Sequence, residues 1–309
     1  MSASRTSVIV AVCTYDRNEP LRVLLDALVV AAVEVRDRAE VGVVVVDDNA
    51  DGKARPVVDD YAGVFALGIH YRVSGKRNIS LARNIAIETA AGLGEWIAMT
   101  DDDCEPVPGW LRAHLDTEER TGADAVTGPM LARVPAGSPD WIEEQPFFDD
   151  QLLTFADGTW ADTAATNNSM LRASFVRDHP EIRFRPELGV VGGEDMVFYR
   201  TAHRAGLRIV FAADAAVWAN EPMSRATLKH QLSYRFWLGN TEYVTNRALG
   251  DASNPRIVLR GVNGLRRALL RSFVRLARGQ RPQWRYSLAC ALRAVGLLLG
   301  PLGVRLRHH

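Results

Sequence analysis

The sequence contains few cysteines. Three of them, Cys13, Cys104 and Cys290, occur in 309 residues, and none is part of a CxxC pair. An odd number of cysteines without this spacing argues against a disulfide framework and against a zinc site. It fits a protein of a reducing compartment.

Long hydrophobic runs are also absent. The first residues, MSASRTS, lead straight into a strand-like run, without the apolar segment and cleavage site of a signal peptide. The stretch AVGLLLGPLGV is too short to span a bilayer, and Arg293 interrupts its extension towards the N-terminus. We therefore expect a cytoplasmic chain, for which peripheral contact with the inner face of a membrane stays open.

Acidic residues and lysine are missing from residues 256–309, which contain twelve arginines. The whole chain has 37 basic and 37 acidic residues, so the part before residue 256 carries 25 basic against 37 acidic side chains. The two parts therefore face different partners or each other.

The rest of the composition is that of a globular protein. Hydrophobic residues make up 47% and charged residues 24% of the chain, which excludes wholesale disorder. The length suffices for one large α/β domain or two smaller ones. There is no internal repeat or low-complexity segment.

Apolar, β-branched runs alternate with segments of helical spacing. This alternation predicts a doubly wound, mainly parallel α/β sheet. In the helix before the fourth strand, Ser80 is the expected N-cap and Gly92 the expected stop. The four strands are predicted at 7–15, 41–50, 69–74 and 95–100.

Carboxylates follow these strands directly. Asp16, Asp47, Asp48 and the triplet Asp101–Asp103 each come at a strand end. In a doubly wound sheet such ends share one edge, where ligands bind. For any one of these aspartates taken alone, the simpler explanation is an acidic turn that faces solvent and binds no ligand.

The triplet at residues 101–103 crowds three like charges. A divalent cation would relieve their repulsion, since Mg²⁺ or Mn²⁺ is typically held by one or two carboxylates plus substrate phosphates. The alternative is that Asp103 or Glu105 favours the first turn of the following helix.

A second acidic motif is GGED, residues 192–195. Two glycines allow a tight turn, and Glu194 and Asp195 then begin a helix. The pair could supply a general base, or it could be a helix cap after a glycine turn.

Several blocks of sequence, in this order, resemble family 2 glycosyltransferases with the GT-A fold, over roughly residues 7–243. Bacterial members that contain a block like RATLKHQLSYRFWLGNTEYV are the most similar. The matching blocks are VAVCTYDRNEPLRVLLDAL, VVVVDDNADG, RNISLARNIAIETAAG, WIAMTDDDCEPVPGWL, TGADAVTGP, ATNNSMLR and GGEDMVFYRTAHRAGLRIVFAADAAVW.

The resemblance implies a metal-dependent, inverting transfer of a sugar from a nucleotide-diphosphate sugar to a hydroxyl acceptor. Asp195 matches the catalytic base, with Glu194 beside it. Asp101 and Asp103 match the outer positions of the DxD motif and are the implied ligands of Mn²⁺ or Mg²⁺. The implied donor-binding residues are Thr14, Tyr15, Asp16, Asp48, Arg83, Asn84, Asp101 and Asp102, and the implied acceptor-binding residues are Asn168, Arg172, Gly193 and Glu194.

The sequence departs from the family at two places. Many relatives have a histidine after the last core strand, where this chain has Asn220 and Glu221, so the third metal ligand is open; His203 and His230 are unsupported substitutes. The motif VDDNADG replaces the commoner VDDGSxD, which leaves base selectivity open. Sugar, nucleotide and acceptor are not specified by the sequence.

The arginine-rich tail allows three interpretations. It could lie on an anionic membrane surface, pack against the acidic part of the chain, or bind nucleic acid; no nucleic-acid recognition motif accompanies the charge, so nucleic acid is not expected. Arginines of 267–278 follow steps of three and four residues among leucine, valine and phenylalanine. The implied division is a nucleotide-sugar half at 1–105, a catalytic and acceptor half at 106–250, and a basic amphipathic helical tail at 251–309.

Two other functions compete with glycosyl transfer. A sugar-nucleotide nucleotidyltransferase would carry a glycine-rich basic loop near the N-terminus, which CTYDRNEP does not supply. A catalytically silent nucleotide-sugar binder or membrane scaffold would have no need to retain Asp101, Asp103 and Asp195 together.

Overall fold

The computed structural model describes residues 5–148 and 155–306, which fold into two compact units. The sheet unit comprises residues 5–131, 155–189 and 194–220. The helical unit comprises residues 132–148, 190–193 and 221–306. These units divide the chain elsewhere than at 105 and 250, because residues 228–249 form a helix that packs with the C-terminal helices.

The sheet unit contains an eight-stranded, mainly parallel sheet. The four strands predicted from the sequence form its first half and are parallel. The strands are, in sheet order, β3 (Ile69–Val73), β2 (Ala39–Asp47), β1 (Thr6–Thr14), β4 (Trp96–Asp101), β9 (Asn168–Arg172), β6 (Ala125–Thr127), β10 (Ile209–Phe211) and β8 (Trp160–Ala161). Strand β9 runs antiparallel to both of its neighbours, and β8 is antiparallel to β10.

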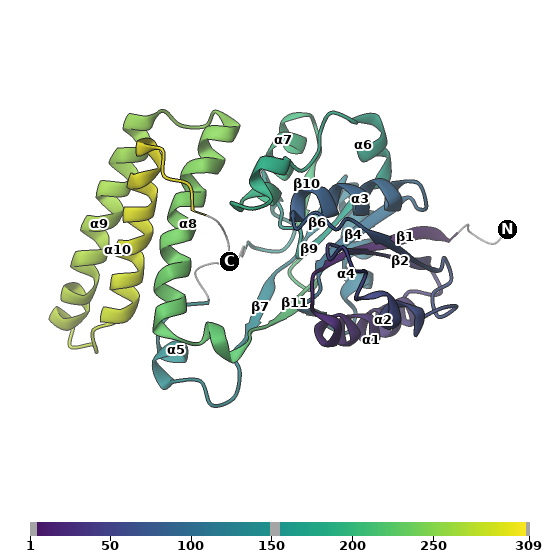
Figure 1. The fold of residues 1–309 in the computed structure, drawn as a ribbon, viewed down its shortest axis with the longest axis horizontal. Coiled ribbons are helices and arrows are strands. Elements are labelled where there is room, and N and C mark those ends of the chain that lie inside the picture. Colours follow the sequence, from purple (N-terminus) through teal and green to yellow (C-terminus); the bar gives the residue numbers. More distant parts are fainter. Residues whose placement is uncertain (1–4, 149–154, 307–309) are drawn as a thin grey trace. The chain divides into compact units, whose positions relative to one another are not determined.

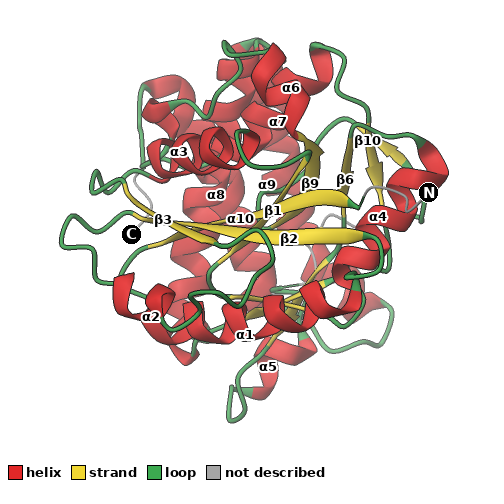
Figure 2. Cartoon of the chain, turned by 90° about the vertical axis from the view of Figure 1, so that its right-hand side faces the viewer, coloured by secondary structure: helices red, strands yellow, loops and turns green. Residues whose placement is uncertain are grey.

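Helices cover both faces of this sheet (Figure 2). Alternate residues of β1 enter different cores: Val8, Val10 and Val12 pack on one face, Ile9 and Ala11 on the other. The chain is therefore doubly wound, as predicted. One face carries α1 (Asn18–Glu34), α2 (Arg55–Asp59) and α4 (Trp110–Thr121), and the other α3 (Ile79–Ala91), α6 (Ala173–Asp178) and α7 (Glu194–Arg204).

The start of α3 corrects one prediction. Asn78, and not Ser80, is the N-cap, since the Asn78 side chain accepts a hydrogen bond from the backbone N–H of Leu81. Ser80 lies one residue inside the helix and is fully buried. The predicted stop at Gly92 is the C-cap.

A small second sheet follows the aspartate triplet. It orders β5 (Cys104–Pro106), β11 (Val217–Asn220) and β7 (Met130–Arg133). Because β5 intervenes, Asp103 and Glu105 do not lie in the first turn of α4, which begins at Trp110 after Gly109 as N-cap. The helix-capping explanation of the triplet is therefore wrong.

The stretch 135–165 contains α5 (Asp140–Glu144) and β8. Residues 149–154 of this stretch lie outside the described residues. Short 3₁₀ turns occur elsewhere at Pro186–Leu188, Met223–Arg225 and Gly300–Leu302.

The helical unit is built on α8 (Leu228–Leu249), α9 (Asn254–Ala277) and α10 (Trp284–Leu299), with α10 packed against both others (Figure 1). Glycines permit a close crossing of α8 and α10: a Cβ at Gly239 or Gly296 would collide with a backbone carbonyl of the facing helix. Within the described residues, no helix is long and apolar enough to cross a bilayer.

Candidate active site

Three strands of the sheet unit end side by side at one edge. The register pairs Thr14 at the end of β1 with Asp47 of β2, and Cys13 with Asp101 of β4. The polar residues that follow these strands therefore gather at the carboxyl edge of the parallel sheet, where ligands of doubly wound folds bind.

The carboxylates after β2 shape the neighbouring loops. Asp47 accepts hydrogen bonds from the backbone N–H groups of Asn49 and Ala54 and from the Tyr71 hydroxyl. Asp48 accepts from the backbone N–H groups of Lys76 and Asn78, just before α3. Both aspartates are buried. Asp48 thereby fixes the loop that leads to Arg83.

The turn after β1 presents Tyr15 and Asp16. Asp16 adopts a positive φ of 53°, and its carboxylate contacts the Lys53 ammonium at 2.9 Å and the Asn49 amide at 2.7 Å. The Lys53 hydrogen bond lowers the pKa of Asp16. The Arg77 guanidinium lies 5.2 Å from the centre of the Tyr15 ring. This turn is exposed to a ligand at the sheet edge and is already cross-linked to the loop after β2.

The three aspartates of the triplet have different surroundings. Asp102 is 4% exposed and accepts hydrogen bonds from the Thr14 hydroxyl at 2.7 Å and from Arg17 at 3.0 Å. Burial raises the pKa of Asp102 to about 6, although Arg17 and Thr14 oppose this rise. Asp101 and Asp103 are more exposed, with 38% and 22% of their side chains accessible. Asp102 therefore holds the turn, and its two neighbours face outward.

Arg83 joins the triplet to the second acidic motif. This buried arginine donates to Asp101 at 3.1 Å and forms an ion pair with Glu194 at the start of α7. Burial disfavours its charge, but Asp101 and Glu194 more than compensate, so the pKa of Arg83 is raised. Two motifs that are more than ninety residues apart in the sequence thus meet at one guanidinium.

Asp195 belongs to the same cluster. Its charge interacts with those of Glu194, Arg83 and Asp101, and one of its oxygens accepts from the backbone N–H of Met196 at 2.7 Å. Burial, and then the neighbouring charge of Glu194, raise the pKa of Asp195 above the usual range of an aspartate. A carboxylate of raised basicity beside an acidic strand end is the arrangement that proton abstraction requires.

The two glycines before Glu194 are required by their backbone. Gly192 and Gly193 have φ angles of 96° and 83°, a region in which other residues are strained. A side chain at either would also collide, at Gly192 with Trp237 and at Gly193 with Thr245, both within the helical unit. The chain passes from the helical unit to the sheet unit between Gly193 and Glu194.

Three residues that the resemblance places in the site make their hydrogen bonds outside this cluster. Arg172 lies opposite Trp96 at the start of β4, and Asn168 opposite Thr100, because β9 runs antiparallel. Arg172 is thus at the far edge of the sheet, where it pairs with Glu118 at 2.6 Å.

The side chains of two asparagines make hydrogen bonds that hold the fold together. Asn168 is fully buried; its oxygen accepts from Trp110 and lies 3.2 Å from the His114 ring, and its amide donates to two backbone carbonyls. The amide of Asn84 exchanges two hydrogen bonds with the backbone of Phe184. The hydrogen bonds of Asn168 use both of its donors and its oxygen, whereas Asn84 keeps one amide N–H and one lone pair.

Comparisons with known proteins identify the family of the chain. The family model for glycosyl transferase family 2 matches residues 9–179, more than half of the chain. The chain belongs to glycosyltransferase family 2.

This family 2 glycosyltransferase has curated relatives. It is 33% identical to the succinoglycan biosynthesis protein ExoM of Rhizobium meliloti over 306 residues, which cover 96% of this chain and 93% of ExoM. It is 31% identical to a glucosyl-dolichyl phosphate glucuronosyltransferase of Haloferax volcanii over 149 residues, 47% of this chain and 43% of the relative.

Solved glycosyltransferase structures share its GT-A fold. The mannosyltransferase PcManGT from Pyrobaculum calidifontis, in complex with GDP-Man and Mn²⁺, superposes with a TM-score of 0.59 at 17% identity and covers 99% of this chain and 78% of its own. TarS residues 1–349 from S. aureus, in complex with UDP-GlcNAc, gives a TM-score of 0.53 at 20% identity, covering 97% and 86%.

The sequence reasoning missed Arg17. Its guanidinium bridges Asp102 at 3.0 Å and Asp103 at 2.8 Å, while 43% of the side chain stays accessible. The signal was present, because Arg17 directly follows the strand-end residues of TYDRN. Pairing between β1 and β4, which brings Arg17 to the triplet, is a non-local feature.

The oxygen donor atoms of the aspartate triplet suit a hard cation. Asp101 and Asp103 offer carboxylate oxygens, and donor phosphates would complete the coordination. In residues 5–148 and 155–306 no three histidine, cysteine or acidic side chains gather into a complete metal site. The backbone N–H of Asn220 donates to the Asp103 carbonyl, so the end of β11 lies beside the triplet. His203 instead contacts the Leu207 carbonyl at the end of α7.

Proposed function

We propose that the chain is a metal-dependent, inverting glycosyltransferase that moves a sugar from a nucleotide-diphosphate sugar to a hydroxyl of a glycan. The observation that carries the proposal is the Arg83 link, which places the Asp195 carboxylate in one electrostatic cluster with the triplet. The donors bound to PcManGT and TarS, GDP-Man and UDP-GlcNAc, support a nucleotide-sugar donor here, and Mn²⁺ in PcManGT supports a divalent cation. The name of ExoM supports a polysaccharide as the acceptor.

Each residue of the cluster has a role in this proposal. Asp101 and Asp103 hold the cation, which when bound neutralises negative charge on the diphosphate leaving group. Thr14, Tyr15, Asp16 and Asp48 line or fix the place of the nucleoside. Arg83 holds Glu194 and Asp101 in position and adds positive charge near the diphosphate.

Asp195 is the general base. Its Oδ atoms accept the proton of the acceptor hydroxyl as that oxygen bonds to the anomeric carbon, and the bond from that carbon to the diphosphate breaks. One displacement from the opposite face inverts the anomeric configuration. The raised pKa of Asp195 strengthens it as a proton acceptor. Gly193 and Glu194, next to it in the chain, are proposed to border the acceptor.

A thermal-shift screen tests donor use. We expect one of UDP-, GDP- or dTDP-sugars to stabilise the protein, with a larger shift in Mn²⁺ than in EDTA. A ligand at 100 times its dissociation constant stabilises the folded state by about 2.7 kcal/mol. If no nucleotide sugar gives a metal-dependent shift, the donor assignment is wrong.

The proposed partner of the tail is an anionic membrane surface. Helix α9 packs on α10 through small residues, since Gly261 and Gly264 approach Leu298 and Ala294. The large apolar side chains of α9 point elsewhere: Leu269 is 74% exposed, Phe273 69% and Leu276 62%.

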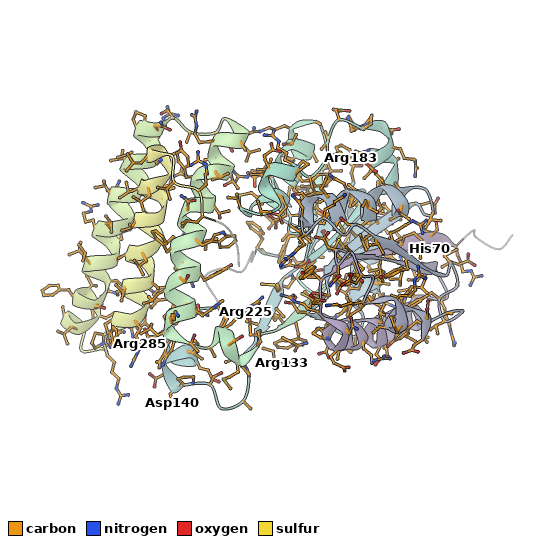
Figure 3. All side chains as sticks on the ribbon, in the orientation of Figure 1. His70, Arg133, Asp140, Arg183, Arg225 and Arg285 are labelled. Carbon is orange, nitrogen blue, oxygen red and sulfur yellow. The ribbon has the colours of Figure 1, made fainter. Side chains whose placement is uncertain are left out.

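These exposed side chains form a stripe. Val258, Val262, Leu269, Phe273 and Leu276 follow steps of three, four and seven residues and so share one face of α9. At the start of α10, Trp284 and Leu288 are also exposed, and the Arg285 guanidinium lies 4.5 Å from the centre of the Trp284 ring and 5.4 Å from that of Trp141. Arg285 is labelled in Figure 3. An apolar helix face accompanied by arginines without any acidic residue is typical of a helix that lies in an anionic lipid interface.

Vesicle binding tests this surface. Leu269→Ser combined with Phe273→Ser is expected to weaken co-sedimentation with phosphatidylglycerol vesicles about 100-fold, because each buried side chain contributes about 1.5–3 kcal/mol. Val30→Ser with Val33→Ser, at exposed positions of α1, is the matched control and should bind like the wild type. Equal binding of both variants would refute the membrane assignment. If the protein instead forms a dimer that only the α9 substitutions dissociate, then the stripe is the contact with a second copy of the chain.

A further inference from the structure

A groove in the helical unit is lined by arginines from two helices. It has a volume of about 410 Å³ and runs between α8, α9 and α10. Its floor is made of small residues, among them Gly261, Gly264 and Ala268 of α9. Its walls carry Arg260, Arg267, Arg271 and Arg293 and one carboxylate, Glu242.

The single carboxylate does not balance these charges. Glu242 pairs with Arg293 at 3.1 Å and with Arg260 at 3.6 Å. Arg267 and Arg271 have no carboxylate partner among the described residues. Like charges held around one small groove repel each other, so an anion in the groove would relieve their repulsion.

The two unbalanced arginines are held in place by other contacts. The Arg271 guanidinium lies 4.3 Å from the centre of the buried Tyr286 ring, and Tyr286 is fixed in turn by a hydrogen bond from its backbone N–H to Gln145. Arg267 donates from Nε to the Asn263 carbonyl at 3.4 Å. These contacts leave donors of both guanidinium groups available in the groove.

The groove is separate from the exposed apolar stripe of α9. With about 100° between successive helical residues, Arg260, Arg267 and Arg271 lie roughly 160° around the helix from Val262, Leu269 and Phe273. The stripe and the groove therefore lie on nearly opposite sides of α9.

We propose that this groove binds a phosphate or diphosphate group. Arginine forks match phosphate oxygens in geometry and charge, and four arginines against one glutamate suit an anion of two or three charges. The volume lies in the range of small-molecule sites. A free anion and the phosphate of a lipid-borne molecule present the same chemistry to the arginines.

Binding of inorganic pyrophosphate in EDTA, by calorimetry and thermal shift, tests the groove. Arg267→Gln with Arg271→Gln is expected to weaken the affinity of this site about tenfold or more. Arg256→Gln with Arg278→Gln removes the same charge from the two ends of α9, outside the groove, and should bind like the wild type. Any pyrophosphate bound in the sheet unit is common to all three proteins and cancels in the comparison.

Further readouts separate the outcomes. In phosphate-free buffer the groove variant should be at least as stable as the wild type, because repulsion is relieved, which checks that it folds. If the groove variant also binds phosphatidylglycerol vesicles more weakly than the control variant does, the bound phosphate group belongs to a lipid. If the two variants differ only in their affinity for pyrophosphate, the ligand is a free anion. Equal pyrophosphate affinity of both pairs, or a shift that potassium chloride at the same ionic strength reproduces, would overturn the proposal.

Discussion

Replacement of Asp195 by asparagine is expected to lower the turnover number about 10²- to 10⁴-fold, the usual contribution of a general base. The substitution keeps the size of the side chain and its contact with the Met196 N–H, but an amide cannot take the acceptor proton. Donor affinity should change little, because the proposed donor contacts lie at the strand ends and not on α7. Steady-state kinetics with the donor found by thermal shift, together with donor titrations, measures the two effects separately.

The control for this variant is Asp178→Asn, the same substitution at an exposed position at the end of α6. It should retain wild-type turnover. The pH profile adds a second check: since the base works when deprotonated, the wild-type rate should rise with pH through the pKa of Asp195. Burial and Glu194 raise that pKa, so this limb should lie above about pH 4, the value of an unperturbed aspartate. Wild-type turnover in Asp195→Asn would remove it from the role of base.

The parallel half of the sheet and its polar edge follow from local sequence patterns. Continuous β-branched runs and helical periodicity are properties of neighbouring residues, and they predict β1 to β4 closely. The two glycines of GGED likewise predict a tight turn from residue type, and in the structure Gly192 and Gly193 adopt positive φ angles. Local sequence patterns therefore suffice to predict β1 to β4 and their order along the chain.

Non-local pairing explains what the sequence did not predict. Nothing local marks β9 as antiparallel, yet this direction carries Arg172 to the far edge and buries Asn168. The ion pair of Arg17 with Asp103 depends on β1 lying beside β4. Ser80 and Asn78 are both good capping residues, and the backbone at Asn78, held by Asp48, decides between them.

The amide of Asn84 illustrates the same limit for a polar side chain. Its position at the start of a helix near the sheet edge suits a donor contact, but its hydrogen bonds go to Phe184, a residue 100 positions later in the sequence. A match to a family motif therefore identifies a position in the fold more securely than it identifies what the side chain contacts.

The second large effect concerns the metal. Asp103→Asn is expected to abolish the additional stabilisation that Mn²⁺ gives in the presence of the donor nucleotide, and to lower turnover about 10²- to 10³-fold, as for other groups that stabilise developing charge. Asp103 is better suited to this test than Asp101, since replacing Asp101 would also release Arg83 from an ion pair that fixes Glu194. Asp116→Asn, at a side chain 56% exposed on α4, is the matched control.

The ion pair between Arg17 and Asp103 leads to a second expected result. It occupies one oxygen of Asp103 but is accessible enough to turn outward, so metal and guanidinium compete for the same carboxylate. Arg17→Gln should therefore leave Mn²⁺ bound with the nucleotide, although burial of Asp102 without its partner costs stability. If Asp103→Asn keeps the full Mn²⁺-dependent shift, then Asp103 does not hold the cation, and the assignment of this ligand is wrong.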